Sequence, residues 1–548
     1  MPQHRISARA SAWLTALFFT ALTLLGLWTS ADYGQPWDEP WEQDILRLNL
    51  NQYAAAFGLD TRLAAQSDMP APASGLIVDS DERDHGECAY YAAFWLVTAE
   101  SMPALTRMAL WHSYTWLWFM AGAAALWCVC RRLGLPRLAA GVAVLLLVLS
   151  PRMFAEGHYN NKDVVLLSLV LLTLWQALRV LERPTAARAV LFSLAGAAAA
   201  NTKIIGLFVW GLCALAVLAR QIAGRRMDGR AWRAAVTALL AFAGFYALLT
   251  PALWADPAGF LKYGLLNAAS FARWQNDVLF RGAVYHLKTV DLPRSYLPYM
   301  IAVTTPLWIL ALIAAGQAFA AGRIVKQNAG PLADDASTGL LLCTLLWAVP
   351  LGYGIFGRPN IYNGWRHFYF IYGPMLALGG YGFHRLWQAL ERRKRRWPRR
   401  AAALALALCV GWTGAGLVGA HPNQYAYYNV LTAGRDLPAY LELDYWNVSV
   451  LQTLQTLLAG MPAGETATVT GGEYCSQHGL ESAHALLPAA DQARLRVLPQ
   501  ASRGARYVLE NSTYAVLGYW RAEAGMQGVA RTEGYGQVLS QVYKRADR

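Results

Sequence analysis

Two adjacent carboxylates, Asp38 and Glu39, lie between Trp37 and Trp41 in the stretch DYGQPWDEPW, about eight residues after an apolar run. Tryptophan side chains often mark the headgroup level of a membrane. A carboxylate held there can meet a substrate whose tail is in lipid and whose head is in water, and it can act as a general base. The alternative is a solvated surface, because residues 31–107 carry 13 acidic side chains.

A second polar stretch, EGHYNNKD, separates two apolar runs and concentrates groups that can bind a substrate. Lys162 in this stretch is a candidate for binding an anionic group. The alternative is helix capping, since Asn161 or Asp163 can accept hydrogen bonds from the first turn of the next helix. The candidates for contact with the substrate are Glu156, His158, Asn161 and Asp163.

Further cations lie near the ends of other apolar runs. Lys203 stands alone between two runs in AANTKIIGLF, where an ionisable side chain is costly and usually functional; the alternative is that it snorkels to the surface. Arg366 and His367 begin a predicted helix in NGWRHFYF. A cation opposes the helix dipole there and favours an anionic partner such as phosphate. Arg273 and Arg358 are additional candidates.

This mixture of carboxylates and cations suits a substrate with an anionic leaving group and a hydroxyl to be deprotonated. Cations stabilise the charge that develops on a departing phosphate, and carboxylates favour an oxocarbenium-like glycosyl centre. The sequence has no GxGxxG after a strand and no Walker loop, so a soluble nucleotide sugar is not predicted. The predicted donor is a sugar on a lipid phosphate.

The elements that must position these residues are membrane helices. The chain of 548 residues is 56% hydrophobic and only 15% charged, whereas soluble domains carry about 25% charge. A span needs roughly 20 apolar residues. About eleven candidates follow, at residues 11–30, 108–130, 138–150, 164–181, 187–202, 204–219, 234–250, 299–320, 338–355, 367–386 and 401–419.

The basic side chains predict the orientation of these spans. With the N-terminus inside, the inner segments hold 23 of the 47 Lys and Arg residues but only 5 of the 34 acidic ones. This asymmetry is the positive-inside pattern. The net charge of +13 therefore reflects topology, and no nucleic-acid partner is predicted. We expect the first apolar run to be an uncleaved helix rather than a signal peptide.

The remaining chain suggests two domains. Residues 1–420 are predicted to form a transmembrane catalytic domain, whose first outer loop, 31–107, includes helices lying in the interface. Residues 421–548 mix a helix-like stretch, VSVLQTLQTLLAG, with strand-like ones, ETATVTG, ARYVLEN and GQVLSQVYKR. We expect a small α/β domain outside the membrane. Cys88 and Cys475 both fall on this side, where a disulfide between them is one option.

The order and spacing of several motifs resemble the polyprenyl-phosphate-dependent glycosyltransferases of the GT-C superfamily. The likeness is to the family 39-like branch of protein O-mannosyltransferases and lipid A aminoarabinose transferases, over roughly residues 11–450. The motifs are GHYNNKD, TPALWADPAGFLKYGLL, VLFRGAVYHLKTVDLPRSYLPYMIAVTTP, YNGWRHFYFIYGP and HPNQYAYYN followed by LELDYWNVS. The resemblance implies a helical polytopic GT-C fold with a small C-terminal α/β domain.

The resemblance also implies roles for individual residues. Asp38 matches the catalytic carboxylate of the first-loop acidic pair, and Glu39 matches its partner. Lys203 matches a position near the lipid phosphate, and Arg366 resembles a late-helix arginine near the donor. The tail resembles the family's variable outer domain, a place for acceptor recognition.

One motif departs from the family pattern. His158 and Lys162 interrupt the plain acidic second motif of the oligosaccharyltransferase relatives. The need for a divalent cation, Mg²⁺ or Mn²⁺, therefore stays open.

These features predict an enzyme of the bacterial inner membrane with a cytoplasmic N-terminus and a periplasmic C-terminus. It would move a sugar from a polyprenyl-phosphate donor to an acceptor hydroxyl with inversion; the sugar and the acceptor (protein, lipid or glycan) stay open. The first alternative is a transporter or flippase of an anionic lipid, which would place its charges near the bilayer midplane. The second is a scaffold that displays the C-terminal domain.

Overall fold

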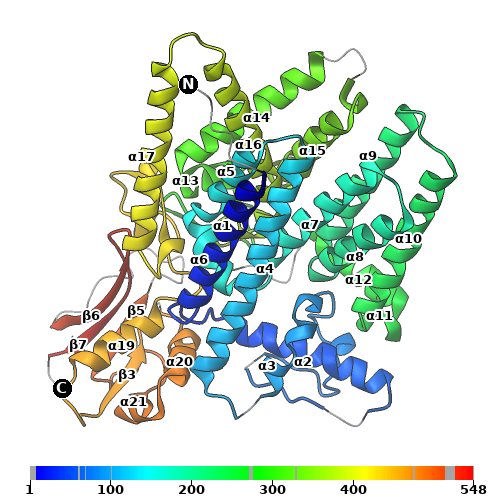
Figure 1. The fold of residues 1–548 in the computed structure, drawn as a ribbon. Helices are drawn as coiled ribbons and strands as arrows, with labels where there is room; N and C mark the ends of the chain where they lie inside the picture. The colour runs from blue at the N-terminus through cyan, green and yellow to red at the C-terminus, as the bar shows by residue number, and fades with distance from the viewer. Residues whose placement is uncertain are drawn as a thin grey trace.

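The computed structural model describes residues 8–546 except 60–61, 68, 100, 271–275, 327–329, 473–474 and 512–524, so the candidate Arg273 lies outside the described residues. The described chain is mostly helical and carries a small sheet near its C-terminus (Figure 1). This arrangement confirms the predicted class, a polytopic helical membrane protein with a C-terminal α/β part.

Eight described helices are long and apolar enough to cross a membrane. The bent pair α5 (Arg137–Val148) and α6 (Pro151–Tyr159) adds a ninth if it counts as one span. The eight helices are α1 (Ala8–Thr29), α4 (Ala104–Arg132), α7 (Asp163–Glu182), α9 (Ile205–Ala223), α10 (Gly229–Leu249), α14 (Leu307–Lys326), α15 (Asp335–Phe356) and α17 (Trp397–Gly419).

This number is smaller than the eleven spans that we expected, because three of the predicted spans contain no described helix that is both long and apolar enough. Predicted span 138–150 is α5, and the chain bends by 72° before α6, where Pro151 starts a new helix. Predicted span 187–202 is α8 (Ala186–Thr202), which has only 17 residues. Predicted span 367–386 begins as a 3-10 turn, η4 (Arg366–Ile371), before α16 (Tyr372–Glu391).

The loop between α1 and α4 folds into short helices. It contains α2 (Glu39–Ala56), η1 (Ile77–Asp79), η2 (Cys88–Ala93) and α3 (Trp95–Thr98). The apolar face of α2 is buried, since Ile45 and Leu48 pack with Ile77 and with Phe260 of α12 (Pro257–Ser270). The other connections contain α11 (Ala252–Ala255), the hairpin β1 (Asp277–Phe280) and β2 (Ala283–His286), α13 (Tyr296–Thr304) and η3 (Gly330–Leu332).

The C-terminal part has a core of its own, built on a five-stranded sheet. The strand order is β4 (Leu495–Val497), β3 (Ala467–Gly471), β5 (Tyr507–Asn511), β7 (Gln537–Arg545) and β6 (Met526–Gly534). β3 pairs in parallel with β4 and β5, and the other pairs are antiparallel. The helical elements are η5 (Gln424–Ala426), η6 (Val430–Thr432), α18 (Leu437–Tyr440), α19 (Val450–Gly460), α20 (Gln477–Leu486) and α21 (Ala489–Arg494).

The helix and the three strands predicted from the tail are thus α19, β3, β5 and β7. α19 packs against β6 and β7, and apolar residues of β3, β5 and β7 belong to the same core. Cys88 and Cys475 are both free thiols, and Cys475 lies in the core of this part.

Both the sheet and the α1–α4 loop lie at one end of the helix bundle, which we call the sheet end (Figure 1). The basic connections between α9 and α10, α14 and α15, and α16 and α17 lie at the opposite end (Figure 1). Segments that the charge pattern assigned to opposite sides of the membrane are therefore separated in space.

Candidate active site

Arg366 lies at the centre of a charged cluster at the sheet end. It follows Asn363 and Gly364, whose positive φ angles of 51° and 70° form a tight turn into η4. Its Nη2 is 3.6 Å from Asp38 Oδ2, and its Nη1 is 3.4 Å from Asp163 Oδ2. Charge-assisted hydrogen bonds are usually about 2.7–2.9 Å long. The guanidinium therefore retains donor capacity for a further anion.

Three aromatic rings surround the Arg366 guanidinium. Its Cζ atom lies 4.8 Å from the ring centroid of Tyr362, 5.4 Å from that of Tyr445 and 4.4 Å from that of Trp446. Such faces attract a cation, and more strongly where water is excluded. Arg366 is only 6% exposed, so the rings hold a buried cation in one orientation.

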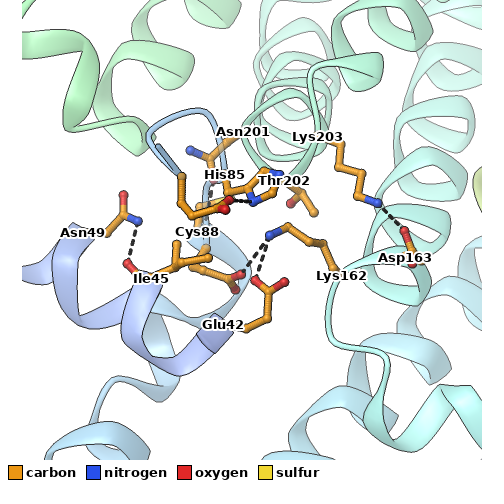
Figure 2. Close-up of polar contacts among 12 residues, drawn as sticks. Glu42, Ile45, Asn49, His85, Cys88, Lys162, Asp163, Asn201, Thr202 and Lys203 are labelled. Atoms are coloured by element: carbon orange, nitrogen blue, oxygen red, sulfur yellow. Dashed lines mark hydrogen bonds and ion pairs between the residues drawn. The ribbon is translucent and has the colours of Figure 1, made fainter. Parts of the chain in front are cut away.

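Asp163 connects Arg366 to Lys203. Asp163 begins α7 and is 1% exposed, while Lys203 ends α8. One carboxylate oxygen of Asp163 binds Lys203 Nζ (Figure 2), and the other faces Arg366 and accepts from Asn160 Nδ2 at 3.3 Å. The Asn160 side chain also caps the Asp163 backbone N–H at 2.8 Å. Two cations thus share one fixed carboxylate.

Lys162 points the other way, toward the first loop (Figure 2). Its Nζ lies 2.7 Å from Glu42 Oε2 and 3.8 Å from Glu87 Oε1. Burial alone would lower the pKa of Lys162, but these two carboxylates raise it. Burial and the neighbouring Glu42 raise the pKa of Glu87 well above its usual range. The positively charged Lys162, the negatively charged Glu42 and the neutral carboxyl group of Glu87 therefore lie together, and their net charge is zero.

Asp38 has the properties of a general base. It precedes α2 but makes no capping hydrogen bond, and 36% of its side chain is exposed. Burial raises the pKa of Asp38 to about 6, against the opposing effect of the Arg366 charge. Most of this carboxyl group is ionised at pH 7, and it can still accept a proton near neutral pH.

Glu39, by contrast, points away from Asp38. Glu39 is 1% exposed. Its carboxylate accepts from Gln35 at 2.8 Å, from Gln43 at 3.2 Å and pairs with His112 Nε2 at 2.8 Å. The structure therefore does not bring the two members of the acidic pair together.

His158 is also separate from the charged cluster. Its ring is stacked between Tyr33 and Trp116, at 4.3 Å from each ring. Nδ1 lies 2.9 Å from the carbonyl oxygen of Phe154, and Nε2 lies 3.2 Å from Thr29 Oγ1. Both ring nitrogens are thus occupied within the helix bundle.

The remaining candidates lie around the cluster. Glu156 is buried and accepts hydrogen bonds from Tyr369 at 2.7 Å and from Asn160 at 2.8 Å. Asn161 is 7% exposed, and its Nδ2 has no hydrogen-bond partner among the described residues. Burial and the charges of Lys203 and Arg366 lower the pKa of His367 well below its usual range. His367 is therefore a neutral group at pH 7.

Arg358 is not part of the cluster. Its guanidinium is 42% exposed and pairs with Asp291 at 3.0 Å.

Sequence reasoning missed the aromatic residues around Arg366. Tyr362 comes from the turn before η4, and Tyr445 and Trp446 come from the segment after the last span. The motifs YNGWRH and LELDYWNVS contain these three aromatic residues, so the clustering of aromatic and charged residues in them could have indicated this part of the site. The Trp37 backbone N–H also donates to the Trp446 carbonyl at 3.1 Å. The site thus draws on residues from both sides of the predicted domain boundary.

The donor groups at this site do not fit a divalent cation. Within the described residues, no group of three or more His, Cys, Asp or Glu side chains is arranged to hold a metal ion. Asp38 and Asp163 already face Arg366, and Asp163 also binds Lys203. A divalent cation there would be repelled by the two fixed positive charges of Arg366 and Lys203.

No family model matches the sequence, and no curated protein matches it. Among solved structures, the apo oligosaccharyltransferase of Archaeoglobus fulgidus is 13% identical over 93% of this chain and 70% of that chain, with a TM-score of 0.48. ArnT from Cupriavidus metallidurans bound to undecaprenyl phosphate is 13% identical over 97% of this chain and 98% of that chain, with a TM-score of 0.47. The apo state of ArnT is 14% identical over 98% of both chains, with a TM-score of 0.48.

Proposed function

We propose that this chain is an integral membrane glycosyltransferase of the GT-C type. It transfers a sugar from a polyprenyl-phosphate donor to an acceptor hydroxyl. The observation that carries the proposal is the half-buried carboxylate of Asp38 beside the cation of Arg366, 3.6 Å away. A general base and a phosphate-binding cation are the two groups that such a transfer requires.

Each group has one role in the proposed reaction. Lys203 and Arg366 bind the donor phosphate, with the neutral His367 as a further contact. Asp38 takes the proton of the acceptor hydroxyl as its oxygen attacks the anomeric carbon. The bond between that carbon and the phosphate oxygen breaks on the opposite face, and the phosphate leaves with the electron pair. The configuration at the anomeric carbon is therefore inverted.

Other predicted residues support this arrangement. Asp163 holds the two cations, and Lys162 fixes the first loop to α7 through Glu42. The buried amide of Asn161 is free to donate a hydrogen bond to the donor. Glu39, Glu156 and His158 maintain the surrounding structure. We place the protein in a bacterial inner membrane, with the N-terminus in the cytoplasm and the sheet end outside.

A transfer assay tests the proposal. The purified chain in lipid nanodiscs is given a panel of radiolabelled polyprenyl-phosphate sugars and a membrane extract as the source of acceptors. We expect label to move to an acceptor, and Asp38→Asn to lower this rate by about 10²–10⁴-fold. Asp32→Asn is the matched control, because Asp32 lies in the same loop but pairs with His421.

Two results would contradict the proposal. One is an Asp38→Asn variant that transfers sugar as fast as the wild type. The other is a complete absence of donor turnover while the lipid crosses the bilayer of proteoliposomes, which would favour a flippase.

A further inference from the structure

A polar cavity of about 340 Å³ lies between the first loop, the start of α4 and α20. α20 lies beside the sheet end of α4 (Figure 1), so the cavity connects segments that are far apart in the sequence. No candidate residue discussed above lines it. Its polar lining includes Gln35, Gln43, Gln66, Ser67, Arg107 and Glu481.

Two amides on one wall present oriented acceptors. Gln35 and Gln43 each use a side-chain N–H on Glu39, at 2.8 and 3.2 Å. Their carbonyl oxygens accept no hydrogen bond within the described part of the chain. Gln43 is only 6% exposed. A ligand in the cavity that supplies N–H or O–H groups can therefore donate hydrogen bonds to these two oxygens.

Two further residues of the cavity lining, Arg107 and Glu481, have charged side chains. Arg107 lies in the first turn of α4, where the helix dipole disfavours a cation. Its guanidinium makes no hydrogen bond or ion pair with any other described residue. Glu481 of α20 accepts a hydrogen bond from Gln477 at 2.8 Å. The cavity lining thus offers both hydrogen-bond donors and acceptors.

A rigid network forms the floor. Arg47 is 2% exposed and pairs with Asp44 at 2.5 Å, with Gln66 at 2.8 Å and with the Val97 carbonyl oxygen at 3.3 Å. Asp44 also accepts from Ser67 Oγ at 2.5 Å. These groups already satisfy one another, so the floor keeps its shape and need not be reordered when a ligand binds.

The cavity also lies close to the proposed base. Gln35 and Pro40 line it, and Asp38 lies between them in the chain. Consecutive Cα atoms are about 3.8 Å apart, so the backbone of Pro40 is within roughly 7.6 Å of that of Asp38.

We propose that this cavity binds the saccharide part of the acceptor, an inference that rests on the proposed function. Sugar hydroxyls both donate and accept, as this lining requires. The volume lies at the lower end of the range of about 300–1,000 Å³ for small-molecule sites. A lipid tail would leave the amides of Gln35 and Gln43 without hydrogen-bond partners.

The test measures binding directly, with the full chain in nanodiscs. The probes are the methyl glycosides of glucose, mannose and N-acetylglucosamine, detected by saturation-transfer NMR. We expect at least one to bind with a Kd on the order of 10 mM. Arg107→Leu is expected to weaken this binding at least tenfold. Ala485→Trp, which fills the cavity from an exposed position on α20, is expected to abolish it.

Arg496→Leu is the matched control, because Arg496 is exposed on β4 and does not line the cavity. Binding that is absent for all three glycosides, or unchanged in Arg107→Leu and Ala485→Trp, overturns the inference even if sugar transfer is active. The converse result is a protein that turns over no donor but binds a glycoside in a way that depends on Arg107. This result would support saccharide binding in the cavity and would refute the proposed function. The two proposals therefore fail separately.

Discussion

The carboxylate of Asp38 lies 3.6 Å from the guanidinium of Arg366, and the same guanidinium lies 3.4 Å from Asp163. Asp38 precedes the first helix of a loop, whereas Arg366 begins a turn before α16. The cation is thus shared between a half-buried carboxylate, that of Asp38, and a fully buried one, that of Asp163. Of these two carboxylates, that of Asp38 is the one that a substrate can reach.

The pH dependence of transfer follows from Asp38. Its pKa is raised to about 6, so the basic form is lost as the pH falls through 6. We expect kcat/KM to fall about tenfold per pH unit below 6 and to be constant above about 7. A pH–rate profile with a saturating donor checks this. A profile that is flat from pH 5 to pH 8 would rule out Asp38 as the base.

The raised pKa of Asp38 also determines whether its ionised carboxylate stabilises or destabilises the folded state. A carboxyl group whose pKa is raised on folding makes the folded state less stable as the pH rises from its unfolded pKa to 6. Asp38→Asn removes that effect. We expect the variant to have a thermal midpoint at pH 7 equal to or above that of the wild type. A lower midpoint would show that the carboxylate stabilises the fold.

Replacing Arg366 with lysine keeps the charge but loses the planar group that lies against Tyr362, Tyr445 and Trp446. Lysine cannot stack in this way or present two parallel N–H groups. We expect Arg366→Lys to lower kcat by about 10²-fold or more, equivalent to roughly 2.7 kcal/mol. Arg358→Lys serves as the control, because Arg358 is exposed and paired with Asp291. Equal activity of both variants would contradict the assignment.

Lys203 and Asp163 form a buried pair whose parts can be separated by a double mutant. Lys203→Met leaves Asp163 with one cation fewer and is expected to destabilise the protein by about 3 kcal/mol. Adding Asp163→Asn should restore much of that stability. Donor binding should not recover, since the role proposed for Lys203 is direct contact with the phosphate. Chemical denaturation and donor titration measure the two effects. Recovery of donor binding in the double variant would show that Lys203 acts only on Asp163.

His158 is expected to behave as a structural residue. His158→Phe preserves the stacking on Tyr33 and Trp116 but removes the contacts with Thr29 and Phe154. We expect a loss of about 1–3 kcal/mol in stability, with kcat unchanged. Circular dichroism melts and the transfer assay measure these quantities. If the His158→Phe variant folds normally but has lost turnover, His158 has a direct role in the active site.

Removal of divalent cations is expected to leave transfer unchanged, because Arg366 and Lys203 already supply the positive charge. The assay is repeated after EDTA treatment and gel filtration. If activity disappears and returns with added Mg²⁺ or Mn²⁺, the proposed charge distribution is wrong.

The sequence predicted one shared face for Asp38, Glu39, Glu156, Lys162, Asp163, Lys203 and Arg366, because the distribution of basic residues assigns each loop to one side of the membrane. Loops assigned to one side of a bundle must meet at one end. The positions of single side chains do not follow from this rule. Asp38 and Glu39 are neighbours at a helix start, where successive side chains point in directions about 100° apart. One faces Arg366 and the other faces His112.

The aromatic residues around Arg366 could not be predicted for a different reason. Tyr445 and Trp446 reach the guanidinium only through the path of the chain after α17. Hydropathy and charge carry no information about that path. The bend of 72° between α5 and α6 was missed because the predicted span ends at residue 150 and the residues of α6 were interpreted as part of a polar connection.

The contact of Trp446 with Arg366, and of its carbonyl with Trp37, has a consequence for biosynthesis. A ribosome delivers Trp37 early and Trp446 only after every long membrane helix has been made. A nascent chain that stops at residue 420 would be inserted but would lack two of the three rings around its central cation. The order of synthesis thus delays assembly of a working site until the membrane part is complete.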